Sequence, residues 1–308
     1  MGSSYPRIFD CFTFSTELDL LEFRLDLLAP VVDRFVIVEA PRTFSGIDKP
    51  LLFAENRDRY ERHLGAITHV VVDDLPPPFP DRWVSDRFQR NAIRRGLQGI
   101  EPDDLVVVTD VDEIPDPAVL ASLRAQPLEA VALEMRPCYY RANWELRRVW
   151  SHPRVVRASA LGLPDQLRWA EHLPSVPAAG THFSYLMGAG DVAQKYRWFA
   201  HDELDTDRDR SATYLETMQA LAVLALTGDS LDINGIHDLN SVQSALLKRS
   251  PKFFCFDEPP RVLRRVAKQW RRARSRTSIP LSFISAGDAA LAAMTRRARG
   301  GRTLGPNE

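Results

Sequence analysis

The sequence predicts an α/β fold in which a mixed β-sheet is flanked by helices and followed by a C-terminal helical appendage. Three observations predict it. The chain opens with a strand, a helix and a second strand, residues 105–109 form an apolar β-branched run of strand length, and 44% of the 308 residues are hydrophobic. A chain of this length and apolar content can bury a full α/β core.

The opening strand–helix–strand unit has a chemical cause at each boundary. Residues 7–12 and 35–39 are apolar runs of strand length. Between them, residues 17–28 place leucines on one side of a helix. Thr16 is in position to cap this helix, and Pro30 follows its end. We therefore expect a βαβ unit at the N-terminus.

The alternation of strands and helices continues along the chain. A proline-rich loop at residues 76–80 cannot enter a sheet, and prolines and a glycine at residues 174–180 mark another loop. The expected order continues with a strand at residues 50–53, a polar helix around 54–63 and a strand at 67–72. A helix at 86–97 follows, then strands at 105–109, 130–135 and 137–140, and a short amphipathic helix at 191–199.

The end of the strand at residues 105–109 carries the most informative motif. Asp110 and Asp112 follow it, and Pro115 ends the extended run. Residues i and i+2 of a strand point to the same face, so both carboxylates can bind one cation. A Mg²⁺ or Mn²⁺ ion held in this way can also bind a diphosphate. The motif predicts a metal–diphosphate site; the alternative is that the acids cap a turn.

Several short segments around this motif resemble glycosyltransferase family 17 in sequence and in order. They are residues 9–12, 17–25, 31–40, 88–91, 110–115 and 180–184, so the resemblance covers roughly residues 7–255. It implies a GT-A (Rossmann-like) fold. It also implies an inverting glycosyltransferase that moves N-acetylglucosamine from UDP-N-acetylglucosamine to a glycan or glycoside hydroxyl, with Mn²⁺ or Mg²⁺ as cofactor.

The resemblance also implies a set of metal ligands. Asp112 would bind the ion directly and act in catalysis, while Asp110 would reach the donor ribose or a metal-bound water. His182 would be a further ligand, although a lone histidine is more often held by ordinary hydrogen bonds. Glu113 should point to the opposite face of the strand, where it would pair with an arginine.

Donor-binding residues are expected at the helix before the metal strand and at strand ends. Arg90 and Asn91 have planar donors that suit a nucleobase, ribose or phosphate. Glu17 and Glu39 follow the first two strands and would border the nucleotide pocket, although Glu17 would also favour a helix N-terminus. Lys195 is placed to contact the diphosphate.

An inverting transfer needs a carboxylate as general base for the acceptor hydroxyl. Five acids downstream of the metal strand are candidates, and the sequence alone does not choose among them: Glu134, Glu145, Asp165, Glu171 and Asp202. We favour Glu171 slightly, because Trp169 and His172 lie in the same loop. The aromatic residues between positions 139 and 169 are either platforms for a sugar ring or part of the core.

Composition limits the partners and the location. Lys and Arg number 40 against 41 Asp and Glu, which gives no electrostatic footprint for a nucleic acid. Three scattered cysteines support neither a zinc ribbon nor a disulfide framework. With no secretory leader and no apolar run near the ~20 residues that span a bilayer, we expect a cytoplasmic enzyme. Animal members of the family are Golgi proteins with a membrane anchor, so we expect a different acceptor: a glycan, glycolipid or glycoside.

The composition changes at Pro259 and Pro260. We expect a GT-A catalytic domain at residues 1–258, a basic amphipathic helical appendage at 259–295 and a disordered tail at 296–308. The arginine-rich residues 261–276 would either lie on the inner face of a membrane or pack on the catalytic domain with their charges in water.

Two other functional classes stay open. A haloacid dehalogenase-like phosphatase also ends a strand with two alternate aspartates, of which the first, Asp110 here, would be the nucleophile. Glu113 and Ile114 stand where that motif has glycine and then threonine or valine. The third class is a non-catalytic module that binds a sugar nucleotide or a glycan.

Overall fold

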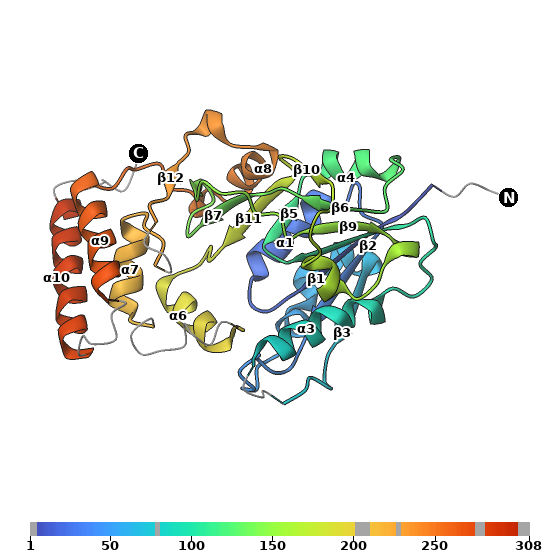
Figure 1. Cartoon of the computed structure of the whole chain (residues 1–308), viewed down its shortest axis with the longest axis horizontal. Helices are drawn as coiled ribbons and strands as arrows, with labels where there is room; N and C mark the ends of the chain where they lie inside the picture. Colours follow the sequence, from blue (N-terminus) through green and yellow to red (C-terminus); the bar gives the residue numbers. More distant parts are fainter. Residues whose placement is uncertain (1–4, 78–80, 201–209, 226–228, 275–280, 301–308) are drawn as a thin grey trace.

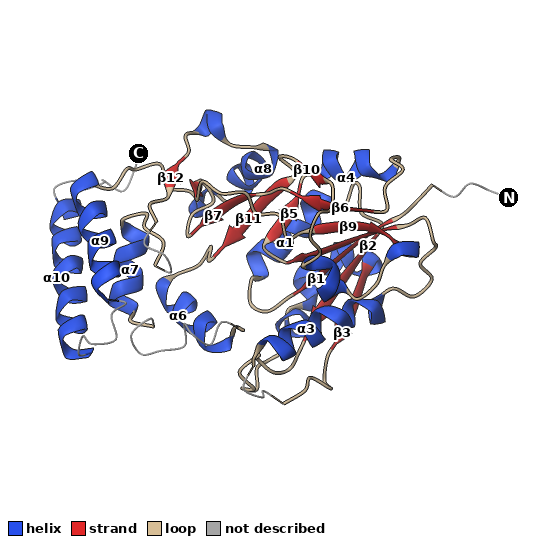
Figure 2. Cartoon of the chain, viewed as in Figure 1, coloured by secondary structure: helices blue, strands red, loops and turns tan. Residues whose placement is uncertain are grey.

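A computed structural model describes residues 5–77, 81–200, 210–225, 229–274 and 281–300. Its larger sheet has the order β10-β6-β9-β4-β1-β2-β3, with β1 to β4 parallel and β9 antiparallel to both β4 and β6 (Figures 1 and 2). The strands are β1 (Ile8–Thr13), β2 (Arg34–Glu39), β3 (Ile67–Val71), β4 (Leu105–Asp110), β6 (Ala130–Leu133), β9 (Arg154–Arg157) and β10 (Ser175–Val176). The predicted mixed α/β fold is confirmed.

A second sheet has the order β12-β8-β7-β11-β5. Its strands are β5 (Glu113–Pro115), β7 (Arg136–Tyr139), β8 (Trp144–Glu145), β11 (Gly180–Ser184) and β12 (Asp232–Ile233). Strand β4 ends at Asp110 in the first sheet, and β5 begins at Glu113 in the second. The acidic motif therefore lies where the chain passes from one sheet to the other.

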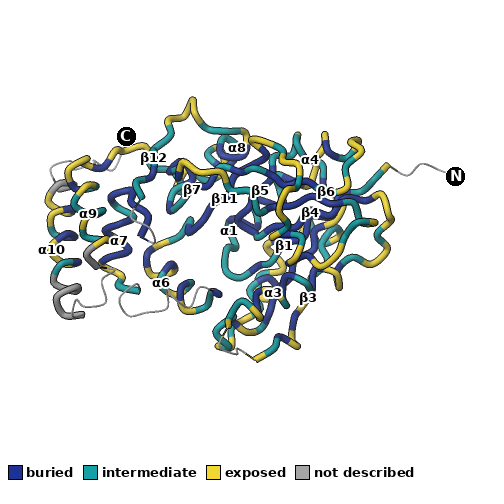
Figure 3. The backbone as a smooth tube through the Cα atoms, viewed as in Figure 1, coloured by how far each residue is buried: buried dark blue, intermediate teal, exposed yellow. Residues whose placement is uncertain are grey.

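Helices cover both faces of the larger sheet. Side chains of β1 alternate between two apolar clusters, with Ile8 and Phe12 in one and Phe9 and Cys11 in the other. Because both faces are buried, as the colouring of Figure 3 shows, the central strands are apolar runs without a polar face. The helices are α1 (Leu18–Leu28), α2 (Leu52–Glu55), α3 (Trp83–Asn91), α4 (Pro117–Arg124), α5 (Pro164–Arg168), α6 (Ala189–Trp198), α7 (Ala212–Ala220), α8 (Ser241–Arg249), α9 (Arg261–Arg274) and α10 (Leu281–Gly300).

Some local expectations differ from the structure. Residues 50–53 lead into α2 instead of continuing the alternation as a strand, and the polar helix around residues 54–63 is largely a 3₁₀ helix at Arg57–Ala66. Thr16 does not cap α1. Its own backbone N–H donates to Glu17, because the Glu17 side chain folds back over the turn.

The C-terminal helices pack on an apolar cluster that includes Trp144, Val192 and Leu215. Leu263 and Ala267 of α9 are buried against it and Trp270 is partly buried, whereas Val262 is 73% exposed. The alternative in which this helix packs on the protein therefore holds, through Leu263 and Ala267. Contact of its outer, arginine-bearing face with a membrane stays a prediction.

Helix α10 continues to Gly300, so residues 296–300 are helical where the sequence indicates a disordered tail. Residues 301–308 lie outside the described part of the chain. None of the described helices combines the length and the apolar character needed to cross a bilayer. The boundary at residue 258 between a catalytic domain and an appendage stays a prediction.

A buried ion pair joins β1 to α1. Arg24, with no exposed surface, donates to both carboxylate oxygens of Asp10 at 2.8 and 2.6 Å. The same guanidinium donates to Thr109 and to the backbone carbonyls of residues 110, 111 and 113. It thereby ties the first βαβ unit to the turn between the two sheets.

Replacing Arg24→Met should destabilise the protein by about 3–5 kcal/mol, because Asp10 would be left as a buried charge without a partner. Urea unfolding of both proteins at pH 7 measures the difference. Arg95→Met is the matched control, since the Arg95–Asp74 pair is exposed and should contribute at most about 1 kcal/mol. Equal losses in the two variants would contradict the assignment.

Candidate active site

A cavity of about 930 Å³ opens at the carboxyl ends of β1 and β4. Its walls come from the β1–α1 loop, the loop at residues 42–44, β11 and one face of α6. Strand ends of an open α/β sheet are the usual ligand site, and the volume suits a nucleotide-sized molecule. The cavity is therefore the candidate site.

Asp110 lies on the floor of the cavity with both carboxylate oxygens engaged. One oxygen accepts from Arg90 at 2.7 Å and from Thr13 at 2.7 Å, and the other accepts from Arg168 at 2.8 Å. Burial opposes the ionisation of Asp110, but Arg168 and Arg90 outweigh it and hold its pKa far below the usual range. Asp110 is thus a fixed anion.

Glu113 is the second carboxylate bound by Arg168. It accepts two hydrogen bonds from Arg168, at 2.8 and 2.6 Å, and one from the Trp150 indole at 2.6 Å. The backbone N–H of Asp110 also donates to Glu113 at 2.7 Å. The expected pairing of Glu113 with an arginine is confirmed, and it orients the aspartate.

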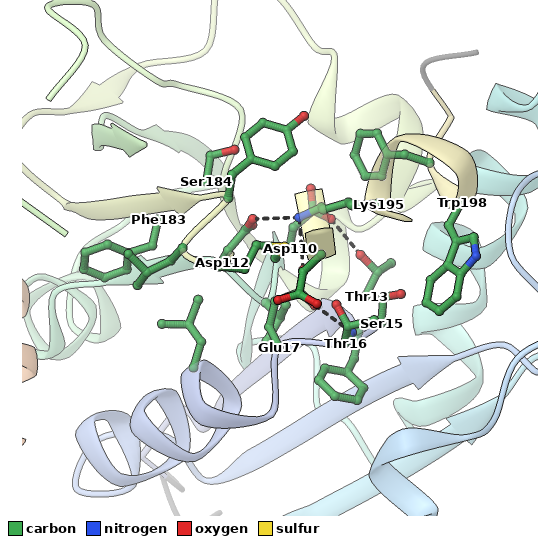
Figure 4. Close-up of a pocket in the computed structure, with 18 of the residues that line it drawn as sticks. Thr13, Ser15, Thr16, Glu17, Asp110, Asp112, Phe183, Ser184, Lys195 and Trp198 are labelled. Carbon is green, nitrogen blue, oxygen red and sulfur yellow. Dashed lines mark hydrogen bonds and ion pairs between the residues drawn. The ribbon is translucent and has the colours of Figure 1, made fainter. Parts of the chain in front are cut away.

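Asp112 has a different environment from Asp110. Figure 4 shows Lys195, on α6, reaching between Asp112 and Glu17. The ammonium lies 3.6 Å from Asp112 and donates to Glu17 at 3.0 Å. All three side chains are nearly buried, with exposures of 10% for Asp112, 9% for Glu17 and 15% for Lys195. Two carboxylates therefore share one lysine.

His182 approaches Asp112 from β11. Its Nε2 lies 3.7 Å from an Asp112 oxygen, which is too long for a hydrogen bond, and its buried Nδ1 has no partner among the described residues. A side chain on Gly180 would meet the Ile114 carbonyl at 2.3 Å, so glycine is needed where β11 pairs with β5. That pairing brings His182 to the acidic turn.

The donor set of Asp112 and His182 fits a divalent cation. Octahedral ligands about 2.1 Å from Mg²⁺ or Mn²⁺ lie about 3–4 Å apart, which matches the separation of these two side chains. In the described part of the chain, no three His, Cys, Asp or Glu side chains gather into a fuller ligand set. An ion here would take its other ligands from a diphosphate and water, as Mg²⁺ commonly does.

Comparison with known proteins identifies the family. The model of glycosyltransferase family 17 matches residues 2–232. The chain belongs to glycosyltransferase family 17. Similar proteins are the β-1,4-mannosyl-glycoprotein 4-β-N-acetylglucosaminyltransferases of Rattus norvegicus, Homo sapiens and Mus musculus, each 31% identical over 150 residues. The match covers 45% of this chain but only 28% of each relative's length.

The structure gathers most of the assigned residues of this family 17 protein at the cavity. Those that line it are Glu17, Arg90, Asp110, Asp112, His182 and Lys195. Glu39, Asn91 and Glu171 do not.

The three residues outside the cavity have other surroundings. Glu39 is buried and accepts from the Phe53 backbone, with Lys49 and His69 beside it. Asn91 accepts from the backbone N–H of Asp165. The Glu171 side chain is 86% exposed. Glu171 therefore faces solvent. Trp169, two residues earlier in the same loop, does line the cavity.

Arg168 and Asp191 are cavity residues with proposed roles that were not predicted from the sequence. Arg168, which holds Asp110, comes from a short helix far along the chain, and nothing in its local sequence marks it. Asp191 lines the cavity four residues before Lys195 on the same face of α6. Within the described residues, its carboxylate makes no ion pair or hydrogen bond. The helical spacing of two oppositely charged residues was a usable signal.

The titration of Asp112 gives a test of this geometry. Burial raises its pKa from 3.8 to about 7, and the carboxylates of Glu17, Asp110 and Glu113 add to the rise against Lys195. The folded protein thus keeps the proton on Asp112 where the unfolded chain has lost it. This stabilisation is complete below about pH 4 and is lost as the pH rises to about 7.

In EDTA, wild type should therefore lose stability relative to Asp112→Asn as the pH rises from 5 to 7, by up to about 1.4 kcal/mol per pH unit. The difference should level off above pH 7. Urea unfolding at each pH measures it. Burial lowers the pKa of His182 to about 4, but His182 is present in both proteins, so its titration cancels in the difference. Parallel curves would refute the assignment.

Proposed function

We propose that this family 17 protein transfers N-acetylglucosamine from UDP-N-acetylglucosamine to a hydroxyl of a glycan or glycoside, with inversion and with a bound Mn²⁺ or Mg²⁺. The observation that carries the proposal is the approach of Asp112 to His182 beside Lys195, on the floor of a nucleotide-sized cavity. The donor sugar is taken from the names of the similar proteins.

Each residue has a task in the proposed reaction. Asp112 and His182 would hold the cation, which when bound acts as a Lewis acid on the leaving diphosphate. Asp110 uses its oxygens on Arg90, Arg168 and Thr13, so we assign it to shaping the floor and not to direct ligation. That assignment replaces its expected role as a ligand in this proposal.

We assign the general base to Asp191. An inverting displacement needs an ionised carboxylate close to the acceptor, and Asp191 faces the cavity without a competing partner among the described residues. Other cavity carboxylates are held by cations: Asp86 by Arg90, and Asp19 by Arg59 and Lys252.

A run of rings that lines the same cavity supports a sugar subsite there. His182 stacks on Trp150 at 4.3 Å between centroids, Trp150 meets the His152 edge at 4.6 Å, and His152 meets Trp169 at 4.7 Å. Trp169 is 52% exposed and lines the cavity, which leaves an open face for a sugar ring.

The phosphatase alternative fits this geometry poorly. Its nucleophile would be Asp110, but that carboxylate is immobilised by two arginines and a threonine. A non-catalytic binding module would need the same donor pocket, so activity separates it from the transferase.

Thermal unfolding with nucleotides tests the proposal first. UDP or UDP-N-acetylglucosamine with Mn²⁺ should raise the midpoint, since a ligand at about 100 times its Kd stabilises by about 2.7 kcal/mol. GDP, ADP, CDP and dTDP should shift it less. The shift should vanish in Asp112→Ala. No shift with any nucleotide would overturn the donor site, and a shift without sugar transfer to any glycan would favour the binding module.

Asp191→Asn should lower kcat about 10²- to 10⁴-fold, because the acceptor hydroxyl would lose its base, while UDP and Mn²⁺ affinities stay at wild-type values. Glu171→Gln is the informative comparison, since the two candidates make opposite predictions. Steady-state kinetics with titration of UDP separates the steps. Loss of turnover in Glu171→Gln with retention in Asp191→Asn would reverse the assignment.

A further inference from the structure

The position of Lys195 raises a question about how the donor site fills. Its ammonium lies 3.0 Å from Glu17 and 3.6 Å from Asp112. Asp112 is also the carboxylate proposed to hold the metal. A lysine cation and a divalent cation beside the same small carboxylate repel each other. The two cations therefore compete for Asp112.

The local charges explain why a lysine stands there. When Asp112 is ionised, Glu17 and Asp112 bring two negative charges into a nearly buried site, and Lys195 supplies one positive charge. Without it, two buried carboxylates would face each other unpaired, which is costly. Lys195 is thus the resident counter-ion of the site before any ligand arrives.

Lys195 is also built to change partners. Beyond its carboxylates, the ammonium meets only ring faces among the described contacts, at 5.3 Å from the Tyr185 centroid and 5.6 Å from the Phe199 centroid. A lysine is a point charge on a flexible stem, so it can turn to a new anion without movement of α6. Figure 4 shows Lys195 on the cavity side of the helix, where a diphosphate would meet it.

We propose that Lys195 is an exchangeable counter-ion: it competes with the divalent cation for Asp112 and transfers its charge to the donor diphosphate when metal and donor are both bound. The inference rests on the proposed function. It makes binding interdependent, because the metal displaces Lys195 from Asp112 and the diphosphate then receives it. Each ligand should therefore tighten the other.

The experiment measures free Mn²⁺ by electron paramagnetic resonance, with and without UDP, in the full chain. Without UDP, Lys195→Met should bind Mn²⁺ at least about tenfold more tightly than wild type, because the competing cation is gone. With saturating Mn²⁺, the same variant should bind UDP at least about tenfold more weakly. A lysine with only a structural role would weaken both.

Two further variants control for charge and volume. Lys252→Met removes a lysine that pairs with Asp19, a carboxylate on the wall of the same cavity, but does not touch Asp112. It should leave both affinities at wild-type values. Lys195→Arg keeps the positive charge, so its Mn²⁺ affinity without UDP should stay near wild type.

The outcomes are separable. If wild type binds Mn²⁺ and UDP but Lys195→Met weakens both or leaves Mn²⁺ binding unchanged, the counter-ion exchange is wrong and the proposed function stands. If Lys195→Arg gains Mn²⁺ affinity as Lys195→Met does, charge is not the cause and the inference is overturned. If wild type binds neither ligand, the proposed function itself fails.

Discussion

The buried guanidinium of Arg24 is the interaction on which the rest of the site depends. The chain leaves one sheet at Asp110 and enters the other at Glu113, and the carbonyls of residues 110, 111 and 113 turn inward at this crossing. Buried carbonyls need donors, and one arginine supplies all three while Asp10 neutralises it. Together with the backbone hydrogen bonds from Val111 to Thr13 and from Phe183 to Asp112, that arrangement fixes the backbone from which the two motif aspartates project.

Two carboxylates two residues apart then take different roles because their surroundings differ. Asp110 meets two arginines and stays ionised, whereas Asp112 meets a lysine that it shares with Glu17 and is more easily protonated. Asp110 therefore has a structural role, whereas the negative charge of Asp112 is only partly neutralised by its neighbours. A partly neutralised carboxylate in a buried site favours cation binding. The different roles of the two aspartates are thus set by their surroundings more than by residue type.

Local patterns in the sequence predicted the central strands and the position of the cavity, whereas features that depend on distant partners were missed. Apolar runs located the strands of the parallel core, and the alternate acids located the cavity, since strand ends define the crevice. Strands of two residues, such as β8, carry too little pattern to find. Arg168 could not be predicted, because its two carboxylate partners lie more than fifty residues away. Asp10 and Arg24 were detectable: a charge in an apolar strand and another on the apolar side of α1 each require a partner.

The C-terminal helices influence the active site because they support α6. Val192 and Tyr196 of α6 are buried in the same apolar cluster as Leu263 of α9 and Leu291 of α10, and Figure 1 shows α7, α9 and α10 side by side next to α6. Lys195 and Asp191 lie on the adjoining face of α6, which lines the cavity. The C-terminal helices therefore share the apolar cluster that holds the buried face of α6. The basic helix α9 thus packs on the same apolar cluster that holds the buried face of α6 beside one wall of the cavity.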